Sequence, residues 1–315
     1  MRYVVYGAGA VGGTIGAKLF EAGNDVTLVA RGEHGRAIAE RGLAFATPEG
    51  TRVLRIPVVD RPASVAFGED SVVVLAVKSQ DTAVALRDLA ACAPEGLPVM
   101  CAQNGVENER SALRHFANVH GMCVQLPAAY LEAGEVRAYA SPTTGALDVG
   151  RYPRGIDEID RAVAADLRAA SFAAEAVEAV MDRKYAKLLA NLRNAILAIA
   201  GHEVSRSSLY DRAQAEATAC FAAAGITVDD AAGRKSPGEK PVGGALRGGG
   251  SSWQSLARGA ESVETDFLNG EIVLLGRLHG VPTPVNAMLQ RVANRSARER
   301  MKPETLSLAD LEREL

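Results

Sequence analysis

The chain has 315 residues, of which 48% are hydrophobic and 23% are charged, and its formal net charge is −3. This length suits about two domains, and the composition is that of a globular protein with a sizeable core. The small net charge argues against a nucleic-acid partner, and no apolar run approaches the roughly 20 residues that a membrane helix needs. We therefore expect neither a nucleic acid nor a membrane as a partner.

The cysteine pattern gives no sign of a disulfide framework or a metal site. The chain has no CxxC pair and no metal-ligand spacing with its five histidines, and its four cysteines are Cys92, Cys101, Cys123 and Cys220. We expect buried thiols in a reducing compartment and predict no metal. A strand-like run at Tyr3–Tyr6 leaves no room for a signal peptide, so a cytoplasmic location is expected.

The first third of the chain alternates short β-branched runs with Ala- and Leu-rich stretches. We predict strands at Tyr3–Tyr6, Asp25–Val29, Ser71–Val77 and Pro98–Cys101, and helices at Gly13–Ala22 and Thr82–Leu89. Strands that alternate with helices indicate βαβ units and a parallel sheet. The continuous apolar run Val72–Val77 suits a strand that is covered on both faces.

The pattern changes in the middle of the chain. Between Cys123 and Val149, Gly, Pro and Thr interrupt short apolar runs, which favours an antiparallel extension of the sheet. We then predict a helix at Gly155–Ala170 and a strand at Ala176–Val180.

After Met181 the pattern is helical almost to the C-terminus, and we predict helices over Lys184–Ala200 and Ser255–Leu278. Between them, Asp229–Gly250 is rich in Gly, Pro and Lys, which predicts a loop. The expected fold class is α/β. We predict an N-terminal Rossmann-type doubly wound sheet over residues 1–178, followed by an all-α domain over residues 179–315.

A glycine-rich turn follows the first predicted strand and opens the first predicted helix. Its sequence, Gly7-Ala8-Gly9-Ala10-Val11-Gly12, matches the GxGxxG pattern of dinucleotide-binding folds. Gly7 permits the tight turn, Gly9 lets a pyrophosphate approach the backbone, and Gly12 allows the helix to pack closely on the strand. The N-terminus of the helix offers free N–H groups to the phosphates. We therefore predict that this loop binds a dinucleotide.

The end of the second predicted strand indicates which dinucleotide. Enzymes that bind NAD usually carry Asp or Glu there, because a carboxylate accepts a hydrogen bond from the ribose 2′-hydroxyl. This chain has Ala30-Arg31-Gly32 instead. A guanidinium can pair with a 2′-phosphate through its planar fork, so Arg31 favours NADP over NAD.

Further motifs resemble the ketopantoate reductase (2-dehydropantoate 2-reductase) family over nearly the whole chain. They stand in the family's order: Gly7–Gly13 with Arg31, Val77-Lys78-Ser79-Gln80, Gln103-Asn104-Gly105-Val106, Lys187-Leu188-Leu189-Ala190-Asn191, and Ser251-Ser252 followed by Glu264. The resemblance implies NADP(H) as cofactor and the reduction of a 2-oxo acid. In the family, the reaction converts 2-dehydropantoate to pantoate in pantothenate and coenzyme A biosynthesis.

The resemblance also implies roles for residues of the first domain. Lys78 and Gln80 are expected in the cofactor site, with Lys78 near the adenosine end. Asn104 resembles the asparagine that lies beside the nicotinamide and the substrate carbonyl. By analogy with some relatives, the long helices of the second domain could hold a homodimer.

Four residues of the second domain carry the implied chemistry. Lys187 resembles the general acid and Glu264 the carboxylate that works with it, while Asn191 and Ser252 resemble substrate hydrogen-bonders. Reduction of a ketone makes an alkoxide, and a lysine can both donate a proton to it and stabilise its charge. Lys187 and Asn191 are four residues apart and share a helix face, and Lys184 lies close to that face as a rival for the lysine role.

One position departs from the family. A second asparagine is usual eight residues after the lysine, but Ala195 stands there and Asn194 comes one residue earlier. A shift of one residue turns a side chain by about 100° on a helix. Three hypotheses therefore stay open: ketopantoate reductase itself, a paralogue that reduces another 2-oxo acid or ketone, and an NADP-binding sensor without turnover.

Overall fold

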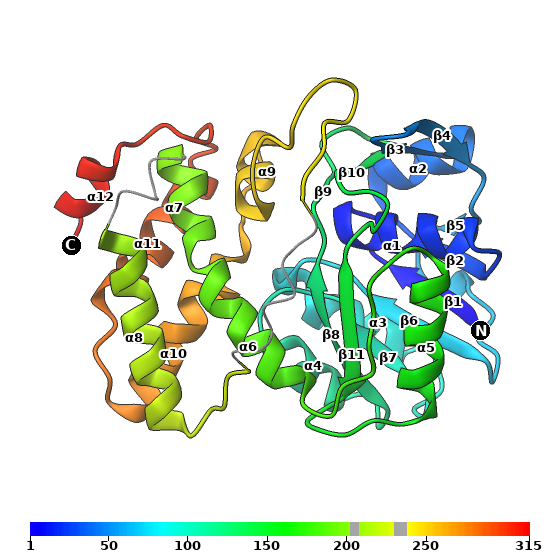
Figure 1. The fold of residues 1–315 in the computed structure, drawn as a ribbon, viewed down its shortest axis with the longest axis horizontal. Helices are drawn as coiled ribbons and strands as arrows, with labels where there is room; N and C mark the ends of the chain where they lie inside the picture. Colours follow the sequence, from blue (N-terminus) through cyan, green and yellow to red (C-terminus); the bar gives the residue numbers. More distant parts are fainter. Residues whose placement is uncertain (202–207, 230–237) are drawn as a thin grey trace. The chain divides into compact units, whose positions relative to one another are not determined.

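The computed structural model describes residues 1–201, 208–229 and 238–315, and it divides into two compact units (Figure 1). Of the described residues, the first unit holds 1–181 and 238–247, and the second holds 182–201, 208–229 and 248–315. Part of the loop predicted at Asp229–Gly250 lies outside the described residues. Its described stretch, 238–250, contains one isolated antiparallel bridge, between Val242 and Ala245, and no helix.

A seven-stranded sheet forms the centre of the first unit, in the order β11-β8-β7-β6-β1-β2-β5. Six strands run parallel, and β11 pairs antiparallel with β8, as the sequence predicts for the end of the sheet. The strands are β1 (Arg2–Tyr6), β2 (Asp25–Val29), β5 (Val58–Val59), β6 (Ser71–Leu75), β7 (Val99–Cys101), β8 (Val119–Gln125) and β11 (Ala146–Arg151).

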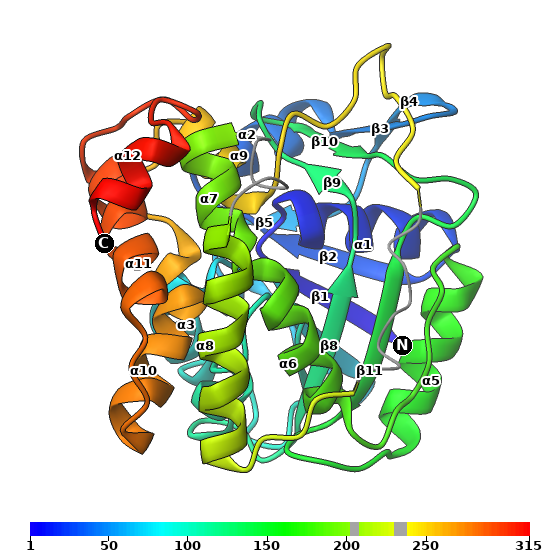
Figure 2. The ribbon, with the colours of Figure 1, turned by 60° about the vertical axis from the view of Figure 1, so that its left-hand side comes forward.

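Helices cover both faces of this sheet, so the doubly wound prediction is confirmed. The helices of the first unit are α1 (Ala10–Glu21), α2 (Gly32–Arg41), α3 (Thr82–Ala90), α4 (Asn108–Leu113) and α5 (Glu158–Ala169), with 3-10 turns η1 (Pro62–Ser64) and η2 (Ser79–Asp81). Figure 2 shows α1 and α5 on one face of the sheet. Because both faces are buried, the central strands β1 and β6 are apolar at nearly every position.

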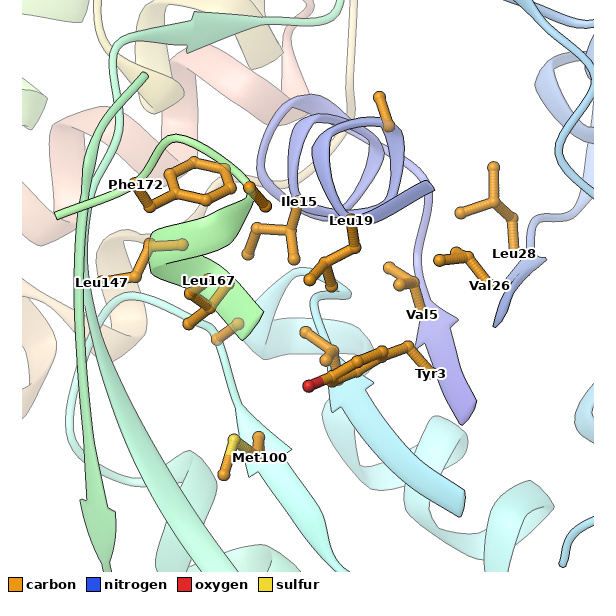
Figure 3. Packing of buried hydrophobic residues seen from close by; sticks show 14 of the residues in the cluster. Tyr3, Val5, Ile15, Leu19, Val26, Leu28, Met100, Leu147, Leu167 and Phe172 are labelled. Atoms are coloured by element: carbon orange, nitrogen blue, oxygen red, sulfur yellow. The ribbon is translucent and has the colours of Figure 1, made fainter. Parts of the chain in front are cut away.

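The alternation of side chains along β1 shows the two cores directly. Val5 belongs to the same buried cluster as Ile15 of α1 and Leu167 of α5 (Figure 3), whereas Val4 belongs to the cluster on the opposite face, with Leu86 of α3. Gly16 allows α1 to pack closely on β2, because a Cβ at this position would stand 2.7 Å from Leu28 Cδ2.

A second sheet, not predicted from the sequence, packs on α1. Its order is β4-β3-β10-β9, with β3 (Leu43–Thr47), β4 (Gly50–Leu54), β9 (Ala128–Ala129) and β10 (Glu135–Ala138). Phe45 and Val136 of this sheet belong to the same buried cluster as Ile15 of α1. The prediction of one extended sheet over residues 123–149 is therefore correct for β11 alone, because β9 and β10 join β3 and β4 instead.

The described part of the second unit is helical. It contains α6 (Val180–Asn191), α7 (Arg193–Ala200), α8 (Ser208–Ala224), α9 (Ser251–Ala257), η5 (Glu264–Phe267), α10 (Asn269–His279), α11 (Pro284–Arg298) and α12 (Leu308–Arg313). Helices α8, α10 and α11 pack against one another (Figure 1). Among the described helices, none combines the length and the apolar character that a membrane crossing requires.

Three sequence predictions need correction. The helix predicted over Ser255–Leu278 is wrong: α9 ends at Ala257, Gly259 takes a left-handed φ of +71°, and α10 begins at Asn269. The strand predicted at Ala176–Val180 is reduced to one bridge between Ala176 and Val149, because α6 already begins at Val180. Cys92 is exposed, unlike the other three cysteines, since it lies just after the end of α3.

Candidate active site

The predicted cofactor residues of the first unit follow neighbouring strands. Gly7 follows β1, Arg31 follows β2, Lys78 follows β6 and Asn104 follows β7, and these strands lie in the order β7-β6-β1-β2. The chain passes from β1 to β2 on one side and later returns to β6 on the other. Ligands of doubly wound sheets bind at such a switch point, at the carboxyl ends of the strands. The structure therefore brings these four residues together at the carboxyl ends of the strands, along one edge of the sheet.

The glycine loop has the shape that a diphosphate needs. Gly7 has a φ of +102°, and a Cβ there would stand 2.8 Å from the backbone nitrogen of Val77. A Cβ on Gly12 would stand 2.0 Å from the carbonyl oxygen of Gly7, so only glycine fits. At Gly9, which precedes the first turn of α1, a Cβ would meet nothing within 4 Å. The loop is closed against the protein at Gly7 and Gly12 and open at Gly9, as the predicted dinucleotide requires.

Arg31 is an exposed residue at the N-terminal end of α2. Within residues 1–201, 208–229 and 238–315, no carboxylate forms an ion pair with it. Burial and the Asp88 carboxylate raise the pKa of Tyr6 on β1, and the nearby positive charge of Arg31 opposes this rise. The Tyr6 hydroxyl donates to Asp88 at 3.5 Å. Arg31 thus places a guanidinium beside the ends of β1 and β2.

Asn104 lies in a loop that buried amides hold in place. The Asn108 Nδ2 donates to the carbonyl oxygen of Asn104 at 3.0 Å and to Ser79 Oγ at 3.2 Å. Gln103 donates to the carbonyl oxygen of Val77 at 3.0 Å, so the loops after β6 and β7 are tied together. Sequence reasoning did not single out Asn108, whose partners lie in loops that only the sheet brings together. Lys78 and Gln80, in the loop after β6, are half-buried.

In the second unit, Lys187 and Asn191 lie one turn apart on α6 and therefore share a face. The Asn191 Nδ2 and the Ser252 Oγ on α9 are buried, and neither has a hydrogen-bond partner among the described residues. A buried donor without a partner costs about 1–3 kcal/mol, so a water or a ligand is expected to accept from each of these groups. Both were predicted as substrate hydrogen-bonders.

Glu264 and the two lysines differ in their surroundings. Glu264 begins η5 and is only 4% exposed, and η5 packs on α10 and α11. Glu264 and Ser252 are not on one continuous helix, because the chain leaves α9 before η5 begins. Lys187 is half-buried, whereas Lys184 is 4% exposed.

Asn194 and Ala195, at the position where the sequence departs from the family, both lie on α7. Ala195 is buried in the helical core at 1% exposure, whereas Asn194 faces α9: its Oδ1 lies 3.6 Å from where a Cβ on Gly250 would stand. Gly250 is the residue before the first turn of α9. The helix predicted over Lys184–Ala200 is divided at Leu192 into α6 and α7, and this break lies between Asn191 and Asn194.

Trp253 explains the glycines that precede α9. A Cβ on Gly249 would stand 2.4 Å from the indole Cγ, and one on Gly248 would stand 2.9 Å from Cη2. The indole Nε1 donates to Glu304 Oε1 at 2.9 Å. Trp253 thus packs under the glycine backbone, and this contact accounts for the two glycines.

A polar cluster outside the predicted site surrounds His120. Its Nδ1 lies 2.8 Å from Asp160 Oδ1 and its Nε2 lies 2.9 Å from Asn118 Oδ1. His120, Asp157 and Asp160 are close enough to hold a metal ion, but Arg151 donates to Asp157 at 2.8 Å. Asp157 and Asp160 also form the capping box of α5. This arrangement is that of a hydrogen-bonded helix cap.

The fold and the loop after β1 define a Rossmann-type dinucleotide-binding protein, and comparisons with known proteins give the family. The family model described as "Ketopantoate reductase PanE/ApbA" matches residues 3–154, and the model of its C-terminal part matches residues 170–297. A 2-dehydropantoate 2-reductase from Archaeoglobus fulgidus is 30% identical over 298 residues, which is 91% of this chain and 95% of the relative.

Solved structures agree with the family models. A PanE/ApbA family ketopantoate reductase from Ralstonia eutropha JMP134 has a TM-score of 0.80 at 27% identity, over 95% of this chain and 99% of that one. A D-mandelate dehydrogenase solved with NADH and anilino(oxo)acetate has a TM-score of 0.79 at 20% identity and the same coverage. The chain belongs to the ketopantoate reductase family and is an oxidoreductase that acts on a CH–OH/C=O group.

Proposed function

We propose that the chain uses NADPH to reduce a 2-oxo acid, with 2-dehydropantoate as the first candidate substrate and pantoate, a precursor of coenzyme A, as its product. One observation carries the proposal: the Asn191 Nδ2 and the Ser252 Oγ are buried without a described partner, and Asn191 lies one turn after Lys187. These groups suit a small polar substrate beside a proton donor.

The first unit would hold the cofactor. Gly9 and the N-terminus of α1 would receive the diphosphate, and Asn104 would lie at the nicotinamide end. The structural neighbour D-mandelate dehydrogenase was solved with NADH, so the preference for NADPH rests on this chain's own Arg31. Arg31, with Lys78, would pair with the 2′-phosphate. When bound, NADPH supplies the hydride that reduces the carbonyl.

The second unit would supply the proton. Lys187 would donate it to the substrate oxygen as negative charge develops there, and its ammonium would stabilise that charge. Asn191 and Ser252 would donate hydrogen bonds that orient the substrate. Glu264 would favour the protonated lysine through its carboxylate.

A paralogous reductase of another 2-oxo acid or ketone is the second candidate. Ala195 favours it, because the alanine is buried and the nearby asparagine, Asn194, faces α9 instead. The two candidates share cofactor and chemistry and differ in the substrate alone.

The test is NADPH oxidation, followed by absorbance, with ketopantoate and a panel of other 2-oxo acids and ketones. We expect turnover with at least one member, with a kcat of roughly 1–10³ s⁻¹. Turnover on ketopantoate would assign the first candidate, and turnover on another acid or on a ketone would assign the paralogue. Tight NADPH binding with a silent panel would contradict a reductase and indicate a sensor.

We also propose that the protein works as a cytoplasmic homodimer. No disulfide joins any of the four cysteines, which suits a reducing compartment. Two leucines of α10, Leu274 and Leu278, are 45% and 66% exposed. Light scattering of the purified protein would give its mass, and a strictly monomeric mass would reject the dimer.

A further inference from the structure

His34 is a buried histidine of α2 to which the family motifs assign no role. The side chain is 8% exposed, and both ring nitrogens are engaged by backbone groups. Its Nε2 lies 2.8 Å from the carbonyl oxygen of Ala8, and its Nδ1 lies 2.9 Å from the backbone nitrogen of Gly134. Ala8 is the second residue of the glycine loop, so α2 contacts that loop through one imidazole.

The two partners fix the protonation of the ring. A backbone N–H can only donate, so the Gly134 amide requires a bare Nδ1. A backbone carbonyl can only accept, so the Ala8 oxygen requires a proton on Nε2. His34 is therefore the neutral Nε2–H tautomer.

The Ala8 carbonyl determines the direction of the next amide. In a planar trans peptide, the C=O and the following N–H point in opposite directions. When His34 holds the Ala8 oxygen, the Gly9 N–H points away from the imidazole. Gly9 is the position of the loop at which a Cβ would meet nothing within 4 Å.

The imidazole is itself held in place by the segment that joins β9 to β10 of the second sheet. Its ring lies against Tyr130, with centroids 4.3 Å apart and an angle of 48° between the planes. Gly134, in the turn before β10, has a φ of +89°, and its carbonyl oxygen accepts from the Ala44 amide at 2.8 Å. Figure 1 shows α2 beside this sheet. The segment between β9 and β10 thus holds the imidazole, whose Nε2 contacts the glycine loop at Ala8.

We propose that His34 is a positioning residue for the diphosphate of the cofactor: it orients the Ala8–Gly9 peptide so that the Gly9 N–H is available to a phosphate oxygen. The inference rests on the proposed dinucleotide function. It adds to that function a side chain that acts on the diphosphate through the backbone.

Two conservative variants separate the two hydrogen bonds. His34→Gln places an amide nitrogen near the Nε2 position and keeps a donor for Ala8. His34→Asn places an amide oxygen near the Nδ1 position, which keeps the acceptor for Gly134 and removes the donor for Ala8. Calorimetry on the full-length protein would measure binding of ADP, which has a diphosphate, and of adenosine 2′-monophosphate, which has none.

We expect His34→Asn to weaken ADP roughly three- to tenfold, the effect of one hydrogen bond, and to leave adenosine 2′-monophosphate unchanged. His34→Gln should retain ADP binding within about twofold. Equal losses for both variants, or equal losses for both nucleotides, would overturn the proposal. Wild-type protein that binds neither nucleotide would instead contradict the dinucleotide function itself.

A measurement on the wild-type protein covers the case in which a variant does not fold. Nitrogen-15 spectra of histidine-labelled protein should show His34 as the Nε2–H tautomer, with its Nε2 shifted by ADP and not by adenosine 2′-monophosphate. An Nδ1–H tautomer, or a His34 that ADP does not shift, would overturn the positioning role.

Discussion

The Arg31 guanidinium is exposed, stands at the end of β2 and has no carboxylate partner in the described chain. We predict that Arg31→Ala raises the Kd for NADPH by roughly 10- to 100-fold and changes the Kd for NADH little. A charge-assisted hydrogen bond is worth about 1.5–3 kcal/mol, and the 2′-phosphate is the group that NADH lacks. Fluorescence titration with each cofactor measures the two constants.

The control for this experiment is Arg114→Ala, which removes another exposed arginine of the same unit, just after α4. It should change neither constant. Equal losses of NADPH and NADH in Arg31→Ala would remove the 2′-phosphate role.

Lys187 and Lys184 form a matched pair on α6. We predict that Lys187→Met lowers kcat by about 10²–10⁴-fold and leaves the NADPH Kd unchanged, because a general acid acts in the chemical step. Lys184→Met keeps the buried aliphatic volume and should retain most of the turnover. Steady-state kinetics on the substrate found in the panel decides between them. If Lys184→Met were the inactive variant, the role of proton donor would pass to Lys184.

Residues that carry motifs could be predicted from the sequence, and residues that act through the backbone could not. Gly7, Arg31 and Lys187 are recognisable because their spacing within short segments carries the signal. His34 binds Ala8 and Gly134, which is 100 residues away in the chain. No periodicity or spacing marks a side chain whose partners are main-chain groups of distant segments.

At the scale of the element, we expect opposite effects from alanine at Gly9 and at Gly12 of the β1–α1 turn: one on ADP binding and the other on stability. Gly12→Ala should destabilise the protein by about 1–3 kcal/mol or more, because its Cβ would stand 2.0 Å from a backbone oxygen that cannot move aside. Gly9→Ala should leave the thermal midpoint nearly unchanged and weaken ADP at least tenfold, because its methyl enters the open space. A Gly9→Ala protein that binds ADP normally would contradict the placement of the diphosphate.

The failure of the Ser255–Leu278 prediction has a local cause. Arg258-Gly259 is a common helix end, with Arg258 at the C-cap and a glycine in the left-handed region directly after it. The Ala260 amide donates to the Ser255 carbonyl at 3.0 Å, which closes α9. The apolar pattern beyond it belongs to η5 and α10. Arg258-Gly259 therefore marks the end of α9 in the sequence, but the amphipathic pattern on both sides of it led to the prediction of one long helix.

The helix α7 carries the next prediction. Asn194→Ala should raise the KM of the 2-oxo acid several-fold and leave the NADPH Kd unchanged, because Asn194 faces α9, which carries Ser252. Ala195→Asn should not restore family-like behaviour. It buries an amide in the core and should lower stability by about 1–3 kcal/mol. An Ala195→Asn protein of normal stability and higher ketopantoate activity would show that the helical register differs from the one described.

At the scale of the whole molecule, the alternation of strands and helices in the sequence predicts the order of layers in the first unit. The same alternation does not predict the second sheet. Its strands are two to five residues long and come from segments that are distant in the chain, 43–54 and 128–138. Short strands of this kind give little periodic signal. Its role becomes visible only in the fold, where Val136 packs on α1 and Gly134 binds His34.

The division into two units makes a last prediction. 2′-Phospho-ADP-ribose contains the diphosphate and the 2′-phosphate but no nicotinamide, so the residues that we propose to bind it all lie in the first unit. At about 100 times its Kd, a ligand stabilises the state it binds by about 2.7 kcal/mol. We therefore expect hydrogen exchange of the full chain to slow at the start of α1, at the β2–α2 turn and in η2. Helices α8, α10 and α11 are the internal control and should exchange at unchanged rates. Protection that appears first in those helices would mean that the nucleotide binds the helical unit, and the assignment of Gly9 and Arg31 would be wrong.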